Sequence, residues 1–402
     1  MTLHDTPYSW LRLFLSVLIA IIGNVGMWAI VVVMPTMQTE LAVDRGDASL
    51  PYTMTMVGFA LGNYLIGRFV DRFGIVWTLI FASCINAGSF WAISVSPNLF
   101  WISVFQMALG FGTAATFGPL IADVSQWFLR RRGIAVAIAA SGNYLSGAIW
   151  PMALSGIMLD GGWRVVYEIL AVLCLAIMIP LSLLLRRSID QASVARSDQL
   201  SESRLASLPV STNSLIWLLG IAGIGCCVAM SMPQVHIVAY CVDLGYGPAV
   251  GAEMLSLMLL GGVVSRLIAG AFSDKLGGLK TLLISSSLQC LGLILFLPYD
   301  GLVSLYVVSA LFGLSQGGIV PSYAIIVREY LPSKRAGEQV GFVLMATIVG
   351  MALGGWMSGW IYEVGGSYFW AFLNGIGLNI LNIAIVGFLT WRAAVVMRSI
   401  AA

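Results

Sequence analysis

Charged residues are scarce in this 402-residue sequence. Asp, Glu, Lys and Arg make up only 9% of it, and hydrophobic residues make up 59%, whereas an average soluble domain is about 25% charged. This composition excludes a water-soluble fold and predicts an integral membrane protein embedded in a lipid bilayer. The formal net charge of +2 points to no charged partner, and we expect no nucleic acid among its partners.

The sequence also lacks the residue clusters that metal sites and active sites require. It has two histidines and six cysteines, and the cysteines fall in or beside apolar runs without the close pairs and histidines of a zinc site. We therefore expect them to behave as small hydrophobic residues, with no disulfide, no metal and no cofactor. Without clustered His, Asp or Cys to supply a nucleophile and base, we expect no catalytic residues and no enzyme activity.

Apolar runs of about 20 residues are what the sequence does contain, and they predict an all-α membrane protein with twelve transmembrane helices. The first run, Leu13 to Pro35, is longer than a signal-peptide core, so we interpret it as a membrane span. The expected spans are 12–35, 50–69, 77–97, 100–127, 133–158, 165–186, 214–240, 250–272, 279–297, 301–328, 338–361 and 367–391.

The segment 187–213 interrupts this pattern. It is rich in Ser, Arg, Asp and Gln, a composition typical of a flexible connector. We therefore predict an N-terminal six-helix bundle at 1–186, a cytoplasmic linker at 187–213 and a C-terminal six-helix bundle at 214–402.

The lysines and arginines predict the orientation of the chain. If both termini are cytoplasmic, all 20 lie on the cytoplasmic side except Arg45, Arg164 and Arg266. Because cytoplasmic loops carry an excess of Lys and Arg, this asymmetry favours cytoplasmic termini. Arg45 and Arg164 would then lie outside, and Arg266 would lie within the membrane.

The two halves of the sequence repeat each other. GRFVDRFG, which begins at Gly67, matches GAFSDKLG, which begins at Gly270, and GFGTAATFGP ends at Pro119 as GLSQGGIVP ends at Pro321. Farther along, RG at 132–133 matches RAG at 335–337. Three matches at nearly one offset predict two homologous bundles with a binding site between them near mid-membrane.

These motifs carry a family resemblance. GRFVDRFG resembles the cytoplasmic loop signature of the major facilitator superfamily. WFLRRRGIAVAIAASGNYLSG (Trp127–Gly147), VHIVAYCVDLGY (Val235–Tyr246) and an arginine eight residues before the second loop aspartate are similar to the monocarboxylate and oxalate/formate transporters. The resemblance implies the major facilitator fold, two pseudo-symmetric six-helix bundles, and alternating-access transport of a small carboxylate.

The sequence departs from those relatives at two places. Animal monocarboxylate transporters usually carry an aspartate four residues before the arginine of the eighth span, where this chain has Gly262. The oxalate exchangers place a lysine in the eleventh span, whereas Glu338–Ile361 contains none. A single buried cation suits a substrate with one carboxylate better than a substrate with two carboxylates.

Arg266 is the main candidate for substrate binding. A permanent cation within a span costs about 2.5–3.5 kcal/mol even on the lenient insertion scale, so we expect it to have a function. Its planar fork would bind a carboxylate through two charge-assisted hydrogen bonds. Alternatively, it pairs with a buried acid or extends toward the cytoplasm, about 12 Å away at Asp274 by helical rise. Its equivalent in the first half is Asn63, whose neutral side chain suggests that charge recognition belongs to the C-terminal half; alternatively, its amide cross-links two helices by hydrogen bonds.

His236 is the candidate for a proton carrier or outer gate, because histidine titrates near neutral pH. Helical rise places it near the outer end of its span, about 20 Å from Arg266. The alternative is a hydrogen-bonded histidine at the membrane interface.

Further candidates lie near the helix-breaking Pro119 and Pro321 and on the first and fifth spans. Proline kinks free backbone carbonyls and are tolerated where a helix lines a cavity; the alternative role for each residue is packing. The substrate-binding candidates are Asn24, Trp28, Thr116, Phe117, Asn143, Tyr144, Gln316 and Tyr323.

The repeated loops predict a conformational latch, in which an aspartate at a helix end beside a cation forms a contact that breaks as the bundles rock. Part of the basic cluster serves only to anchor the chain by the positive-inside rule. The latch residues are Gly67, Asp71, Arg72, Gly74, Asp274 and Lys275.

The favoured function is a secondary active transporter of a lactate- or pyruvate-like monocarboxylate, coupled to a proton or a counter-anion. A dicarboxylate or oxalate/formate-type anion exchanger on the same fold is the alternative. A multidrug antiporter is disfavoured because it would usually need a membrane-embedded acid. A sensor is disfavoured because it would usually carry an added soluble domain. We expect a monomer in a cell membrane, with compact loops that suit a bacterial inner membrane.

Overall fold

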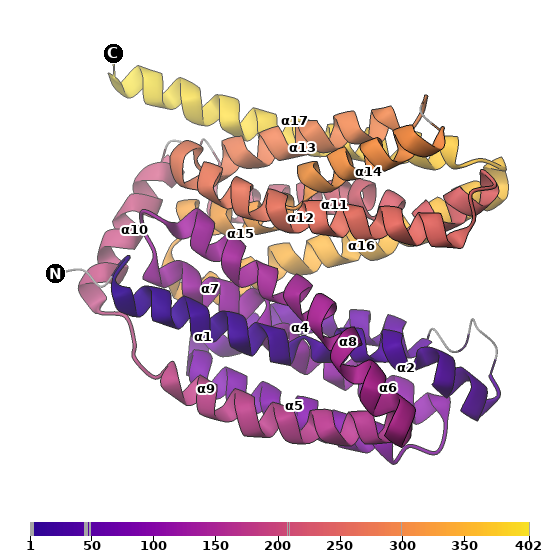
Figure 1. The fold of residues 1–402 in the computed structure, drawn as a ribbon. Coiled ribbons are helices and arrows are strands. Elements are labelled where there is room, and N and C mark those ends of the chain that lie inside the picture. Colours follow the sequence, from indigo (N-terminus) through magenta and orange to yellow (C-terminus); the bar gives the residue numbers. More distant parts are fainter. Residues whose placement is uncertain are drawn as a thin grey trace. The chain divides into compact units, whose positions relative to one another are not determined.

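The computed structural model describes residues 4–43, 47, 50–206, 208, 210–298 and 300–401, and these residues form helices and connecting loops without any strand (Figure 1). The predicted all-α fold is confirmed. Eleven of the described helical segments are long and apolar enough to cross a membrane. The remaining predicted span, 50–69, corresponds to the 24-residue helix α4 (Leu50–Phe73), which is less apolar. Arg45 lies outside the described residues.

The chain divides into two compact units, and unit 1 consists of Met1–Leu129, Ile138–Ala195 and Ser333–Met345. Within it, α4 and α6 approach so closely that a side chain at Gly58 or Gly110 would meet the backbone of the other helix. A π-helical turn, Cys174–Met178, precedes the last helix. The remaining helices of unit 1 are α1 (Pro7–Gly23), α2 (Val25–Leu41), α5 (Ile75–Ser94), α6 (Leu99–Thr113), α7 (Gly118–Trp127), most of α8 (Arg132–Leu173) and α9 (Ile179–Leu184).

Unit 2 consists of Arg130–Ala137, Arg196–Pro332 and Ala346–Ala402. Phe296, Phe312 and Phe372 pack together in its hydrophobic core. The helices α8 and α16 each begin in one unit and continue in the other. The other helices of unit 2 are α10 (Gln191–Ala206, from Arg196 on), α11 (Thr212–Asp243), α12 (Pro248–Leu276), α13 (Gly278–Leu295), α14 (Leu302–Gln316), α15 (Ile319–Tyr330) and α17 (Tyr368–Ala401), with α16 spanning Ala336–Gly365.

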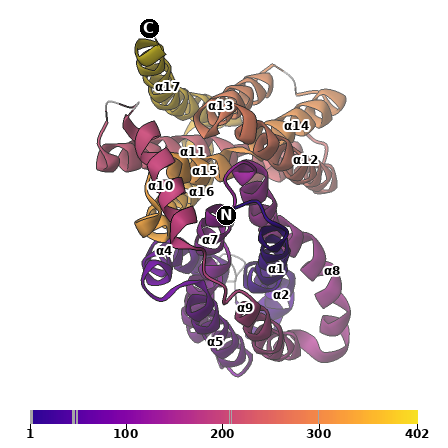
Figure 2. The ribbon, with the colours of Figure 1, turned by 90° about the vertical axis from the view of Figure 1, so that its left-hand side faces the viewer.

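The expectation of a flexible connector at 187–213 is wrong over α10, which faces the viewer in Figure 2. Ser197 and Ser201 are four residues apart and therefore share one face of this helix. Arg132 donates to the Ser197 hydroxyl (3.0 Å), and the Ser201 hydroxyl donates to the Arg328 carbonyl (3.3 Å). Arg204 pairs with Glu329 at 3.3 Å. The polar composition that suggested flexibility supplies the groups that dock the helix.

Two helix breaks precede the prolines that predicted them. A 3₁₀ turn (Ala114–Thr116) and the irregular Phe117 separate α6 from α7, and Pro119 lies in the first turn of α7. Likewise, two residues separate the end of α14 from the start of α15, and Pro321 lies within the first turn of α15. Proline suits these positions because the first N–H groups of a helix have no partner within it. A third break, at Asn24 between α1 and α2, was not expected from the sequence.

Candidate transport site

Arg266 lies on α12 beside the break between α14 and α15. Its side chain is buried, with 4% exposure, and its Nε donates to the carbonyl of Gly317 at 3.1 Å. Gly317 ends α14, where backbone carbonyls carry a partial negative charge. The break therefore provides a local reason why unit 2 tolerates a buried guanidinium.

Gln316 is the residue next to that carbonyl, and it is 2% exposed. Its Oε1 accepts from Nε2 of Gln234 at 2.8 Å. Its own Nε2 has no hydrogen-bond partner in the described part of the chain. A buried donor without an acceptor costs about 1–3 kcal/mol, so this amide is unusual in a folded interior.

Asn63 occupies the position in unit 1 that Arg266 occupies in unit 2, 203 residues earlier (266 minus 203). It is fully buried, its Nδ2 donates to the Phe59 carbonyl, and its Oδ1 accepts from the Gly118 N–H at 3.2 Å. These hydrogen bonds agree with the helix-linking interpretation of Asn63. Both residues thus reach the break of a facing helix, but Asn63 caps a helix start whereas Arg266 meets a helix end.

Three predicted residues of unit 1 form one hydrogen-bonded cluster. Asn24 donates to the Thr116 hydroxyl (3.1 Å), and Asn143 donates to the Asn24 amide oxygen (3.2 Å). Trp28, one turn farther along, packs against Gly147, and its buried Nε1 has no partner among the described residues. The structure therefore brings α1, the α6–α7 break and α8 together at these polar groups.

The other aromatic candidates lie among packing contacts. Phe117 packs against Phe59, with ring centroids 5.7 Å apart, and Tyr144 is partly buried on α8. Tyr323 is fully buried, and its hydroxyl donates to Oδ1 of Asn382 at 2.8 Å. These contacts agree with the packing alternative for Phe117 and Tyr323.

His236 on α11 makes two hydrogen bonds within unit 2. Its Nε2 lies 2.8 Å from the Gly355 carbonyl, and its Nδ1 lies 3.2 Å from the Tyr368 hydroxyl. Because a carbonyl only accepts, Nε2 carries a proton, and in the neutral ring Nδ1 accepts from Tyr368. A second proton on Nδ1 would require the tyrosine hydroxyl to turn and accept.

The aspartates of the two repeated motifs, near the ends of α4 and α12, each cap the start of another helix. Asp71 accepts from the N–H groups of Gly337 and Glu338, both at 2.8 Å, at the start of α16. Asp274 accepts from the N–H groups of Gly133 and Ile134 at the start of α8. A carboxylate stabilises the partial positive charge at a helix N-terminus.

Glycine is required on both sides of each cap. A Cβ on Gly67 would meet the Gly337 carbonyl, and a Cβ on Gly133 would meet the Gly270 carbonyl. Gly74 and its counterpart Gly277 have φ values of 78° and 83°, which favour glycine over other residues.

The basic residues of the predicted latch lie differently. Arg72 is exposed with its guanidinium 5.3 Å from the Phe73 ring, and Lys275 is exposed. The sequence did not identify the starts of α8 and α16 as the capped elements, although the repeat of RG at 132–133 and RAG at 335–337 marks both.

Eleven described helical segments long and apolar enough to cross a membrane indicate a multi-pass membrane protein. The family model for the Major Facilitator Superfamily matches residues 16–299 and 237–400. The chain belongs to that superfamily, whose members are transporters.

Sequence relatives are distant. The chain is 24% identical over 337 residues to the MFS-type transporter pynF of Aspergillus niger, covering 82% of this chain and 75% of that protein. It is 26% identical over 261 residues to Monocarboxylate transporter 13 of Rattus norvegicus, covering 64% of this chain and 60% of that protein.

Solved structures share the fold. The human organic anion transporter MFSD10 (TETRAN) has a TM-score of 0.75 at 13% identity, covering 95% of this chain and all of that one. The Escherichia coli fucose:proton symporter FucP has a TM-score of 0.70 at 15% identity, covering 94% and 98%. At these identities the likeness concerns the fold alone.

Proposed function

We propose that the protein is a secondary active transporter of a small organic monocarboxylate and that Arg266 binds the carboxylate. The observation that carries this proposal is the buried guanidinium of Arg266 at the break between α14 and α15. A guanidinium presents its N–H donors in a planar fork, and the one at Nε of Arg266 donates to the Gly317 carbonyl. The fork suits the two oxygens of a carboxylate.

The neighbouring Gln316 supports an oxygen-rich ligand. Its buried Nε2 lacks an acceptor in the described chain, and a hydroxy or keto oxygen beside a carboxylate would supply one. Among the relatives, proteins named Monocarboxylate transporter 13 occur in rat and cattle, and this agrees with such a substrate.

Proton symport is the proposed coupling. A carboxylate entering alone against an inside-negative potential of 100 mV loses about 2.3 kcal/mol, whereas a proton travelling with it cancels the charge. His236 is the proposed proton carrier or outer gate. Asp71 and Asp274 belong to the proposed conformational latch. The proposed location is a cell membrane, with both termini in the cytoplasm. Exchange against a second anion, as in an oxalate/formate-type exchanger, is the competing function.

Uptake of labelled acids into proteoliposomes tests the proposal. The native chain should take up lactate or pyruvate faster when the outside is acidic. Arg266→Ala should lower uptake at least about tenfold, because charge-assisted hydrogen bonds contribute about 1.5–3 kcal/mol. Arg266→Lys should retain only part of the activity, because lysine keeps the charge but not the fork.

Lys280→Ala, which removes an exposed cation of the same unit, is the matched control and should transport normally. Full uptake by a folded Arg266→Ala variant would overturn the role of Arg266. Uptake that depends on oxalate or formate inside the vesicles, and not on pH, would favour the exchanger.

A further inference from the structure

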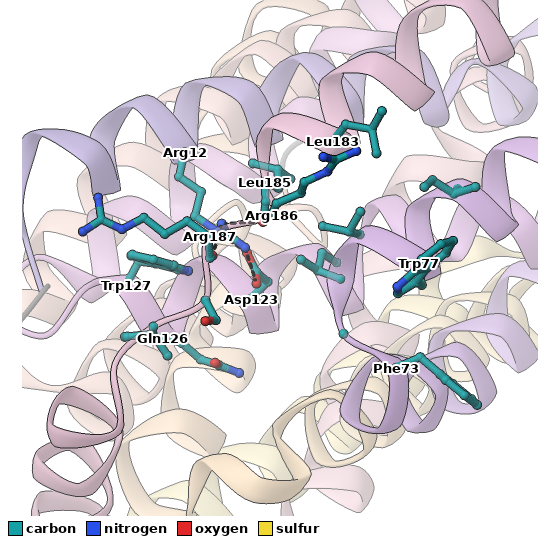
Figure 3. Close-up of a pocket in the computed structure, with 16 residues that line it drawn as sticks. Arg12, Phe73, Trp77, Asp123, Gln126, Trp127, Leu183, Leu185, Arg186 and Arg187 are labelled. Atoms are coloured by element: carbon teal, nitrogen blue, oxygen red, sulfur yellow. Dashed lines mark hydrogen bonds and ion pairs between the residues drawn. The ribbon is translucent and has the colours of Figure 1, made fainter.

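A pocket of about 520 Å³ opens in unit 1, away from Arg266 and its neighbours (Figure 3). It lies where α1 and α5 begin and where α7 and α9 end. The start of α5, the end of α7 and the residues just after α9 supply most of its lining. None of these residues has a role in the proposed carboxylate site.

The lining carries more positive than negative charge. Arg12, Arg186 and Arg187 contribute three cations and Asp123 contributes one carboxylate, which leaves a net charge of +2. Arg12 donates to both oxygens of Asp123, at 2.8 and 2.9 Å, and Figure 3 shows this pair at the centre of the pocket. The Asp123 charge is therefore already compensated, and the excess resides on Arg186 and Arg187.

The buried pair also fixes the segment that carries the two other arginines. Nη1 of Arg12 donates to the backbone carbonyls of Leu185 and Arg187, both at 3.0 Å. The side chains of Arg186 and Arg187 are exposed, and Figure 3 shows them extending to different sides of the Arg12–Asp123 pair. Two exposed cations are thus held on a rigid backbone at the rim of a cavity.

The start of α5 adds backbone donors to this lining. Gly74, Ile75, Val76 and Trp77 line the pocket, and Gly74 at the N-cap has no side chain that could cap the helix. The first N–H groups of a helix have no acceptor within it and carry a partial positive charge. They favour an anion, phosphate in particular.

The repeat in unit 2 shows what such a helix start uses as its partner. There, α13 begins after Gly277, the counterpart of Gly74, and Oε2 of Glu329 accepts from the Gly278 N–H at 2.9 Å. Arg204 pairs with the same carboxylate. The start of α13, an arginine and an anion therefore form one closed cluster within the chain.

Unit 1 has no such carboxylate at the equivalent position. Glu329 is eight residues after Pro321 (329 minus 321), and eight residues after Pro119 stands Trp127 (127 minus 119). Trp127 is 2% exposed, and the Arg12 guanidinium lies 4.6 Å from its ring centroid. Unit 1 therefore has the same helix start and arginines of its own, but an indole stands where unit 2 has the acid.

We propose that this pocket binds the phosphate group of an anionic phospholipid. Arginine forks bind phosphate oxygens in pairs, and basic pockets between membrane helices hold anionic headgroups. A lipid is favoured over a free anion because Trp77 and Phe73, both in the lining, are 66% and 48% exposed. Aromatic side chains at the ends of spans lie at headgroup level, where the acyl chains of a bound lipid would pass them.

Thermal unfolding of the full chain in a neutral detergent tests the site, because a ligand that binds only the folded state raises Tm. Short-chain phosphatidylglycerol should raise Tm, and phosphatidylcholine of the same chain length should not. In Arg186→Gln/Arg187→Gln the phosphatidylglycerol affinity should fall about thirtyfold, since each arginine contributes to headgroup attraction.

The matched control, Lys334→Gln/Arg335→Gln, removes two adjacent exposed cations of unit 1 that lie outside the pocket. It should respond to phosphatidylglycerol as the native chain does. Ser188→Glu places a carboxylate in the lining while both arginines remain, and it should abolish the response, whereas Ser203→Glu on exposed α10 should not.

An equal Tm shift in the native chain and the arginine double variant would overturn the proposal. So would a shift by inorganic phosphate alone that matches phosphatidylglycerol, because the site would then bind a free anion. Neither result bears on uptake through Arg266, so this site and the proposed function stand or fall separately.

Discussion

Arg266 and Asn63 show how one position of a repeated sequence acquires two roles. Each reaches a break in a facing helix, Asn63 at the start of α7 and Arg266 at the end of α14. A neutral amide satisfies a helix start, whereas a guanidinium suits the carbonyls of a helix end. The two units therefore keep the same break but place a charge at only one of them.

At this scale, Gln316 provides the sharpest prediction. Gln316→Leu should raise the KM for the transported acid about tenfold, because a hydrogen bond to a charged ligand contributes about 1.5 kcal/mol. The measurement is initial uptake against substrate concentration, with Tm recorded for the same preparation. The substitution removes a buried donor that has no partner, but it also removes the acceptor of Gln234, so the two effects on Tm should largely offset each other.

Gln289→Leu is the matched control for this substitution. Gln289 is equally buried in unit 2, but its Nε2 donates to the Cys226 carbonyl at 3.0 Å. Its Oε1 has no partner among the described residues, so this amide too is half satisfied, and its replacement should leave KM unchanged. If Gln316→Leu instead lowered Tm with no change in KM, the amide would be structural.

Single residues could be predicted from the sequence only where their chemistry conflicts with their surroundings. Arg266 was found because a cation is costly in an apolar run. Gln316 was a candidate because it lies near Pro321, but the missing acceptor of its amide could not be predicted, because its Oε1 partner, Gln234, lies 82 residues away on α11. Tyr323 stood beside a helix-breaking proline as expected, but the rotamer that joins it to Asn382 follows from packing.

At the scale of helices, the caps on α8 and α16 are the central feature. Each start donates to both oxygens of one aspartate, Asp71 near the end of α4 or Asp274 near the end of α12. The glycines opposite each cap let the two backbones meet. These caps make the helix starts depend on residues more than 100 positions away.

Hydrogen exchange of the capped amides tests this dependence. Asp71→Ala should speed exchange at Gly337 and Glu338 about fivefold, because a lost N-cap contact costs about 1 kcal/mol. Asp274→Ala should do the same at Gly133 and Ile134. Each variant is the control for the other, and faster exchange at both sites in either variant would contradict two separate caps.

The expectation of a flexible connector was wrong at α10 because the contacts that hold this helix also come from residues outside the segment. Composition distinguishes polar from apolar segments, and a polar segment without a hydrophobic face suggests a linker. The order of α10 instead comes from Arg132, Arg328 and Glu329, none of which belongs to the segment. Apolar runs and prolines, whose meaning is local, predicted the membrane helices and two of the breaks well.

At the scale of the whole molecule, charge balance during transport is the property to measure. A one-to-one symport of a monocarboxylate and a proton moves no net charge, so an imposed potential should leave accumulation unchanged. A carboxylate moving alone would accumulate about fiftyfold less at 100 mV inside negative, because the potential opposes it by about 2.3 kcal/mol.

Proteoliposomes with a potassium diffusion potential and equal pH on both sides provide the measurement. Accumulation that falls with the potential would contradict electroneutral coupling. Accumulation that is insensitive to the potential but requires an anion inside the vesicles would favour exchange over proton symport.

Because α8 and α16 each start in one unit and finish in the other, the two halves of the sequence do not coincide with the two compact units. In a chimera that joined the first six spans of this chain to the last six of a distant homologue, the start of the native α8 would have to be capped by the homologue's counterpart of Asp274. The four glycines and two aspartates of the two helix caps, rather than the membrane spans, would then decide whether such halves are compatible.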